Sequence, residues 1–247
     1  MTAETSGSAR LTVFTPISQG GRADVVAQRI TEAIRLGLVA EGEQLPSEAE
    51  LAAQFGVSTV TLREALASLR EQGYVTTRRG RNGGSFVRRP RSHPTDRLAQ
   101  ELARLSSTEL RDLGDEATAV SAACAGLAAR RAERATVTRM FELARALADT
   151  APVAECARLD SRFHIEVAVG SQSERLTRRE VSLQSEYANL LWLPEPEPLD
   201  PAAVAADHVA IAAAIENEDE SLAYSLARGH ATANMRRLIR AHIGLTT

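Results

Sequence analysis

Short apolar stripes separated by clear stop signals occupy the first third of the chain. After residue 22, apolar side chains recur at helical spacing on one face: Val25, Val26, Ile30, Ile34 and Leu38. This spacing predicts an amphipathic helix over residues 23–38. Residues 1–21 are rich in Ser, Thr and Gly and have weak periodicity, so we expect a flexible leader there.

Two short helices are predicted next, because each has its own start and stop residues. Ser47 is followed three residues later by Glu50, the sequence of a capping box, and Gly56 is a natural C-terminal breaker. Ser58 is the predicted N-cap of the following helix, which ends at Gly73. Two helices joined by so tight a turn form a helix-turn-helix.

A β-hairpin is predicted directly after these helices. β-Favouring residues at 74–77 lead into a turn through Gly83 and Gly84, and Phe86 and Val87 return. Residues 74–91 contain no acid and six arginines: Arg78, Arg79, Arg81, Arg88, Arg89 and Arg91. A hairpin with this charge fits a wing that binds an anion such as DNA.

The rest of the chain is predicted to be helical. A stiff polar connector with Pro90 and Pro94 marks a linker over residues 90–95. Beyond Asp96 the composition is dominated by Ala, Leu, Glu and Arg, with breaks that indicate six or seven helices. The predicted fold is therefore mainly α, with a winged helix-turn-helix over 22–89, a small β wing and an all-helical bundle over 96–243.

Composition adds three constraints to this picture. Hydrophobic residues make up 44% and charged residues 25% of the 247 residues, which is ordinary for a globular chain of two domains. The net charge of -3 hides a basic front, because residues 1–91 carry 12 Arg against 9 acids. No apolar run is long enough to cross a bilayer and no secretory signal is present, so we expect a cytoplasmic protein with reduced, structural Cys124 and Cys156.

The second helix of a helix-turn-helix enters the major groove with its N-terminal residues on bases and phosphates. The candidate DNA-binding side chains on that helix are Ser58, Thr59, Thr61 and Arg63, and those on the wing are Arg79, Gly80 and Arg81. Arg63 can form bidentate bonds to guanine or to a phosphate. The alternative is a small folded domain whose arginines are merely solvated.

These residues also carry a family resemblance. The run LPSEAELAAQFGVSTVTLREALASLREQGYV, followed by RRGRNGGSFV, resembles the N-terminal domain of GntR-family regulators over residues 23–88. The resemblance implies binding of double-stranded operator DNA. Ala49 and Thr59 stand where the family usually has arginines that contact DNA, so the family's operator sequence does not transfer to this chain.

The C-terminal half contains residues suited to binding a metal. Asp160 and His164 are four residues apart on one predicted helix and therefore face the same side, while His208 and His230 lie within apolar stripes of the last two helices. One carboxylate and three imidazoles can bind a first-row divalent metal. Interior histidines can equally be hydrogen-bonded core residues.

A second resemblance bears on this choice. The runs LDSRFHIEVAVGSQSERL and ADHVAIAAAIENEDESLAYSLARGHATANMRRL resemble the FadR-type ligand domain of the GntR family, called FCD, over residues 95–243. The resemblance implies a metal site at the same four residues, with zinc expected first and nickel or manganese as alternatives. It also implies a small organic acid effector. Ala117 and Ser121 replace the family's Arg and Glu, which leaves Arg111, Arg175 and Ser173 as candidate effector-binding residues.

Together these features predict a ligand-responsive homodimeric regulator that binds a pseudo-palindromic operator and represses transcription until an effector binds. One alternative is a metal-dependent hydrolytic enzyme, but the sequence has no nucleophile or general-base motif beside the four candidate ligands. Another alternative keeps DNA binding and makes the helical bundle purely structural.

Overall fold

The computed structural model describes residues 14, 23–80, 83–88, 95–150, 152–194 and 197–246. The chain divides into two compact units, Met1–Arg91 and Ser92–Thr247, and each is considered by itself. The expected leader, apart from residue 14, and the expected linker, apart from residue 95, lie outside the described residues.

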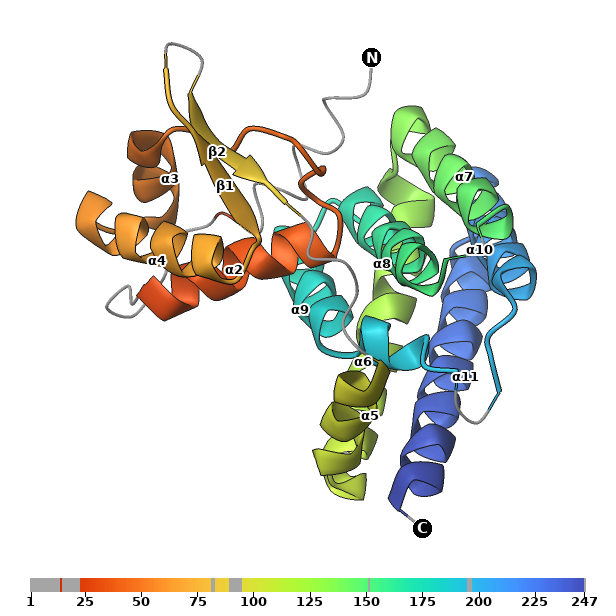
Figure 1. Ribbon diagram of the computed structural model, residues 1–247. Helices are drawn as coiled ribbons and strands as arrows, with labels where there is room; N and C mark the ends of the chain where they lie inside the picture. The colour runs from red at the N-terminus through yellow and green to blue at the C-terminus, as the bar shows by residue number, and fades with distance from the viewer. Residues whose placement is uncertain are drawn as a thin grey trace. The chain divides into compact units, whose positions relative to one another are not determined.

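The N-terminal unit consists of three helices and a hairpin in its described part. The elements are α2 (Ala23–Arg35), α3 (Glu48–Phe55), α4 (Thr59–Glu71), β1 (Val75–Arg78) and β2 (Gly84–Val87), as Figure 1 shows. β1 pairs antiparallel with β2, from Val75 opposite Val87 to Arg78 opposite Gly84. Ile30 of α2, Leu51 and Phe55 of α3 and Leu62 of α4 are fully buried, and α2 and α3 both pack against α4 through such apolar side chains.

The ends of α3 and α4 form as their cap residues predict. The Glu50 backbone N–H donates to Ser47 Oγ at 3.3 Å, and the Ser47 N–H donates to Glu50 Oε2 at 2.8 Å. Gly56 ends α3 in the left-handed region at φ 66°, and Ser58 Oγ accepts from the Thr61 N–H at 3.1 Å to begin α4. The local capping chemistry therefore sets the tight turn between the two helices.

Helix α2 ends three residues before the predicted limit of Leu38. Gly37 adopts φ 69°, and the Leu38 N–H donates to the carbonyl of Ala33, which closes the helix with a glycine turn. Leu38 is still only 3% exposed. The apolar stripe thus identified a core residue correctly, although that residue packs from the turn and not from the helix.

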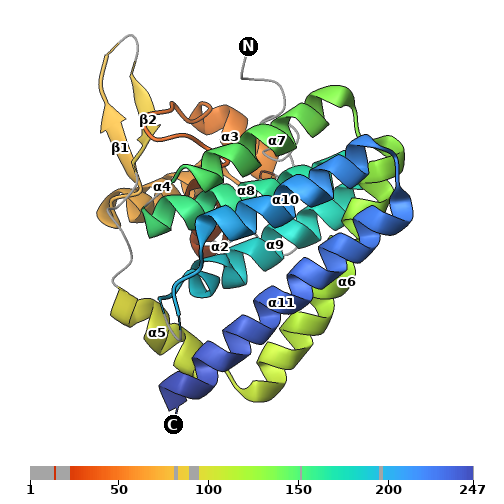
Figure 2. The same ribbon diagram turned by 90° about the vertical axis from the view of Figure 1, so that its right-hand side faces the viewer.

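The C-terminal unit is all-helical in its described part. Its helices are α5 (Thr95–Arg104), α6 (Ser107–Arg131), α7 (Arg134–Ala148), α8 (Val153–Gly170), α9 (Glu174–Leu191), α10 (Pro201–Glu216) and α11 (Glu220–Thr246). Helix α6 packs along α11, and α7 packs against both α8 and α10 (Figure 2). The predicted all-helical bundle is confirmed.

Helix α8 lies at the centre of this unit, in contact with α6, α7 and α9. Twelve of its residues are buried, and they include Asp160, His164 and Glu166 among apolar side chains. Both cysteines are free and buried, and burial raises the pKa of the Cys124 thiol, as suits an inert structural residue. A central helix that buries three ionisable groups is unusual for a purely structural element.

Candidate metal centre and DNA-reading elements

The N-terminal end of α4 presents polar side chains to solvent. Ser58 and Thr59 are exposed, and the hydroxyls of Ser58 and Thr61 lie 2.9 Å apart. The Arg63 side chain is 67% exposed, and its Nε donates to Glu48 Oε2 of α3 at 2.7 Å. Helix α3 therefore orients the arginine that the sequence analysis selects for DNA contact.

The hairpin presents a second group of the predicted DNA-binding residues. Arg79 and Gly80 are exposed beyond the end of β1, and Gly80 adopts φ 113°, where glycine is strongly favoured. Arg81 lies outside the described residues. A Cβ on Gly83 would lie 2.5 Å from the backbone oxygen of Arg78, so the returning strand approaches too closely for any side chain there.

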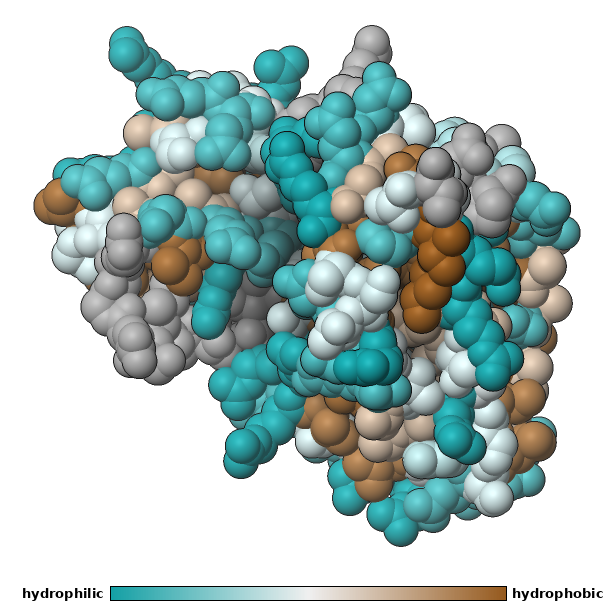
Figure 3. Space-filling model, turned by 90° about the horizontal axis from the view of Figure 1, so that it is seen from below, coloured by the Kyte–Doolittle hydropathy of each residue, from teal (hydrophilic) through white to brown (hydrophobic). Residues whose placement is uncertain are grey.

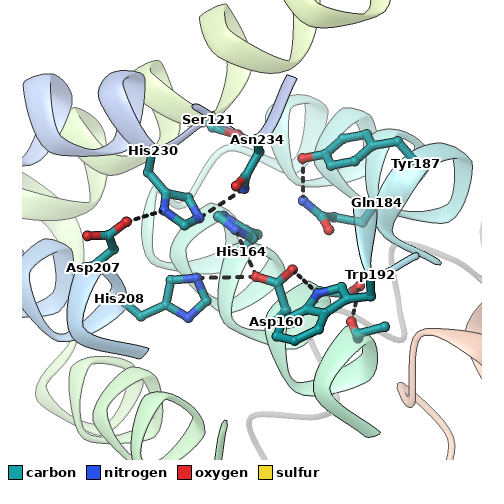
Figure 4. A network of polar contacts seen from close by, with 12 residues as sticks. Ser121, Asp160, His164, Gln184, Tyr187, Trp192, Asp207, His208, His230 and Asn234 are labelled. Atoms are coloured by element: carbon teal, nitrogen blue, oxygen red, sulfur yellow. Dashed lines mark hydrogen bonds and ion pairs between the residues drawn. The ribbon is translucent and has the colours of Figure 1, made fainter. Parts of the chain in front are cut away.

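Four candidate ligands from three helices meet inside the C-terminal unit (Figure 4). Asp160 and His164 come from α8, His208 from α10 and His230 from α11. One ligand atom of each residue lies within 4.8 Å of the others. Their exposed fractions are between 0% and 8%, so the cluster is shielded from bulk water. The structure thus brings together all four residues that the sequence analysis proposed as metal ligands.

Several polar atoms of this cluster lack a hydrogen-bond partner among the described residues. Asp160 Oδ1 lies 3.4 Å from His164 Nε2 and 3.3 Å from His208 Nε2, and neither pair has hydrogen-bond geometry. Both ring nitrogens of His208 are also unpartnered. An unsatisfied buried polar atom costs about 1–3 kcal/mol, so several converging on one point are expected only where something else binds them.

Neighbouring side chains hold the candidate ligands in place. The Trp192 indole donates to Asp160 Oδ2 at 2.8 Å, and the Phe163 ring stacks on His208 with 3.9 Å between centroids. His230 is held at both nitrogens, with Nδ1 3.0 Å from Asp207 Oδ2 and Nε2 3.0 Å from the Asn234 amide nitrogen. Carboxylate contacts of this kind orient metal-binding imidazoles.

The electrostatics of Asp160 and His208 favour the protonation states that a metal needs, whereas Asp160 outweighs burial at His164 and raises the pKa of that ring. Burial by itself would raise the pKa of Asp160, but the adjacent His164 and His208 outweigh it and hold that pKa below its usual range. Burial lowers the pKa of His208 to about 3, so its ring is neutral at pH 7. An ionised carboxylate and a neutral imidazole are the forms that coordinate a divalent ion.

A second buried carboxyl lies next to this cluster. Ser121 Oγ of α6 donates to Glu180 Oε2 of α9 at 3.2 Å, and the Gln184 amide donates to Glu180 Oε1 and to the Tyr187 hydroxyl, both at 2.9 Å. Burial raises the pKa of Glu180. A cavity of about 10 Å³ is lined by both Glu180 and His164. This carboxyl is therefore the polar group that a small molecule beside His164 would meet.

The residues proposed for effector binding lie elsewhere. Arg111 is exposed and lines a groove of about 430 Å³ between α6 and α11, while Arg175 is exposed in the first turn of α9. Ser173 is the N-cap of α9, and its backbone N–H donates to Ser171 Oγ. The structure does not bring any of the three to the cavity at His164.

Sequence reasoning missed the residues that support the cluster, although weak signals existed. Asn234 follows His230 by one helical turn, and Asp207 directly precedes His208. Trp192 is the single tryptophan of the chain, but its contact with Asp160 spans 32 residues and no local pattern encodes it. Glu180 gave a signal that its charged neighbours obscured, because it is at helical spacing with the apolar Leu176, Leu183 and Tyr187.

The outer surface has more ordinary chemistry. The face in Figure 3 carries mainly hydrophilic side chains, with hydrophobic ones in separate small areas. In the part of the chain that the structure describes, the large hydrophobic residues that are exposed are Val60, Val153, Val209, Leu222, Tyr224 and Ile243. Among the described residues, no helix combines the length and apolar character needed to cross a bilayer.

A helix-turn-helix with a wing, joined in one chain to a helical unit with a buried polar cluster, defines a ligand-responsive DNA-binding regulator. Residues 22–87 match the model of the bacterial regulatory proteins of the gntR family, and residues 117–233 match the FCD domain. The chain belongs to the GntR family of transcriptional regulators. Membership of this family identifies the protein as a DNA-binding transcriptional regulator and not as an enzyme.

Comparisons with individual proteins agree with this assignment. The HTH-type regulator RmpR of Mycobacterium gastri is 42% identical over 92% of this chain and 84% of RmpR. The Glc operon transcriptional activator of Escherichia coli (strain K12) is 31% identical over 62% of each chain. The solved structure of E. coli McbR/YncC shares the fold, with a TM-score of 0.52 at 14% identity over 90% of this chain and 98% of that one.

Proposed function

We propose that this regulator senses its effector through one divalent metal ion held by Asp160, His164, His208 and His230. The observation that carries the proposal is the convergence of the four residues, three of which, Asp160, His164 and His208, have buried ligand atoms without a hydrogen-bond partner. Three nitrogen ligands and one oxygen ligand suit zinc first, with nickel or manganese as alternatives. When bound, the ion would supply a Lewis-acidic position for an oxygen atom of the effector.

The surrounding residues support this ligand set. Trp192 fixes the Asp160 carboxylate, and the Asp207 carboxylate accepts from His230 Nδ1–H, which leaves the lone pair of Nε2 for coordination. That lone pair faces the Asn234 amide in the structure. Because the Nε2 lone pair accepts one bond only, an ion bound at His230 would take the place of the Asn234 amide.

We further propose that the protein acts as a homodimeric repressor. Winged helix-turn-helix proteins commonly bind two half-sites related by two-fold symmetry, which requires two copies of the DNA-binding unit. Effector binding would lower operator affinity by a coupling free energy of about 1–3 kcal/mol. The Glc operon relative is an activator by name. A reporter assay with and without effector therefore tests whether this protein represses transcription until the effector binds.

A small organic acid is the effector that the family resemblance favours, but the described residues around His164 offer no arginine to bind its carboxylate. Arg111 and Arg175, the candidates for that role, are exposed outside the cavity.

Elemental analysis tests the metal proposal. The full chain, purified without chelator and without an affinity-tag metal, should contain about one divalent ion, which His164→Ala and His230→Ala should each lose. His242→Ala is the matched control, because His242 is also buried but its Nδ1 donates to the carbonyl of Leu102. A wild type that binds no zinc, nickel or manganese would refute the proposal, as would metal retention in both variants.

A further inference from the structure

We propose that Val60 is a specificity-determining residue for operator DNA, and that its side chain packs against the C5-methyl group of a thymine in the major groove. The inference rests on docking of the N-terminal end of α4 in that groove, as is general for the second helix of a helix-turn-helix. It names one base that the protein selects in each operator half-site and the side chain that selects it.

The exposure of Val60 is the first observation. At 61% it is the highest among the exposed large hydrophobic residues of the described chain, and the other five all lie in the C-terminal unit. Val60 is the second residue of α4, after Thr59, and the Ser58 cap fixes where that helix begins. A single exposed valine is ordinary on a protein surface. This one differs because it lies in the first turn of the helix that enters the groove.

The charge of that first turn is the second observation. The first turn of α4 contains no acidic residue, whereas the first turn of α3 contains Glu48 and Glu50. An acidic residue there would stabilise α4 through the helix dipole, and the chain lacks this contribution. The first turn of α4 therefore carries no carboxylate that would repel the phosphates on either side of a groove, so Val60 can approach the base pairs between them.

Polar side chains surround Val60 in the sequence. Arg63 is one helical turn further along the same face and is exposed, and its Nε donates to Glu48 Oε2, which orients the guanidinium. The hydroxyls of Ser58 and Thr61 lie 2.9 Å apart. Such groups can bond to phosphates or to polar base edges, but a valine has neither donor nor acceptor. Among the exposed residues from 58 to 63, Val60 alone is restricted to an apolar contact.

The major groove offers one methyl group to such a side chain. Of the four bases only thymine carries a methyl on its major-groove edge, beside the N–H donors and the N and O acceptors of the base pairs. Val60 packed against a donor or acceptor would leave that group without a partner, whereas packing against the methyl removes apolar surface of both from water. Burial of one methyl-sized group changes affinity by about fourfold.

Deoxyuridine in place of thymidine tests the proposal, because it removes the C5-methyl group and keeps the base pairing and every hydrogen-bonding group. An operator duplex is first selected in vitro from a random library with the full chain, and each of its thymines is then replaced in turn. In fluorescence anisotropy, one replacement in a half-site should weaken binding by wild type about fourfold. Val60→Ala, a truncation at an exposed helix position, should bind the thymine and uracil duplexes equally.

Arg63→Ala is the matched control, because Arg63 lies on the same face of α4 and takes no part in the methyl contact. It should weaken binding to both duplexes and keep their ratio near fourfold. If no replacement of thymine weakens binding by wild type, or if Val60→Ala keeps the wild-type ratio, this inference is overturned, whereas a loss of affinity in Arg63→Ala still supports docking of α4. If neither variant weakens binding to the selected duplex, docking of α4 is refuted and this inference with it.

Discussion

His208→Leu separates the metal-binding role of the cluster from its structural role. Both ring nitrogens of His208 are buried without a hydrogen-bond partner, so a side chain of similar size without polar atoms removes no hydrogen bond. The substitution does remove one of the four proposed ligands. We therefore expect a protein that folds nearly as well as wild type without metal but gains little stability when metal is added.

The expected magnitudes follow from the contacts of His208. Releasing its unsatisfied atoms stabilises by about 1–3 kcal/mol, and losing the stacked ring of Phe163 costs about 0.5–1.5 kcal/mol. The metal-free stability should therefore change by an amount between about 0.5 kcal/mol of loss and about 2.5 kcal/mol of gain, and the neighbour that Asp160 loses moves it toward the lower end. In wild type, metal at 100 times its Kd contributes about 2.7 kcal/mol, or roughly 5–10 °C in Tm for a unit of this size.

Thermal unfolding with and without metal measures both effects. His242→Leu is the reciprocal control, because His242 Nδ1 donates to the Leu102 carbonyl at 3.1 Å and lies outside the cluster. That variant should lose about 1 kcal/mol without metal and keep the full metal-dependent rise in Tm. A full metal-dependent rise in His208→Leu would show that His208 is not a ligand and that its unpartnered nitrogens need another explanation.

Three further predictions concern other parts of the chain. Arg63→Ala should weaken operator binding roughly 5- to 150-fold in fluorescence anisotropy, and Arg70→Ala, at the far end of the same helix, should weaken it less; equal losses would contradict docking by the N-terminal end of α4. Gly83→Ala should lower operator affinity without changing metal content, because its Cβ would meet the Arg78 carbonyl at 2.5 Å. Burial raises the pKa of Glu166 from 4.5 to about 7, so its stabilising contribution is complete below about pH 4.5 and is lost as the pH rises through 7. The advantage of Glu166→Gln over wild type in free energy of unfolding should therefore be on the order of 3 kcal/mol larger at pH 8 than at pH 4.5. Parallel plots of the free energy of unfolding against pH for the two proteins would refute this.

The N-terminal unit was predictable because its signals are local. Ser47, Glu50, Gly56 and Ser58 each act within four residues, and the structure places every one of them at the helix end that its chemistry favours. The error at Leu38 has the same origin. An apolar stripe reports which residues face the core, but Gly37 decides where the helix stops, and both kinds of signal have to be read together.

The candidate site was predictable only in part, because its geometry is long-range. The spacing of Asp160 and His164 follows from one helical turn, whereas their meeting with His208 and His230 depends on how three helices pack. Family resemblance supplied that information here. It did not supply Glu180, whose charged neighbours suggest a solvated position, whereas the packing of α9 against α8 and α6 buries it.

The position of the cluster would explain how an effector bound there, as proposed, could influence the whole C-terminal unit. Its ligands come from α8, α10 and α11, and the Ser121–Glu180 pair adds α6 and α9. A ligand shifts an equilibrium only by its differential affinity for two states, so the states must differ in how these helices meet. A regulatory coupling of about 1–3 kcal/mol equals the cost of leaving one buried polar atom unsatisfied. If the effector binds as proposed, gain or loss of a single contact at Asp160 or Glu180 would therefore be enough to favour one packing over the other.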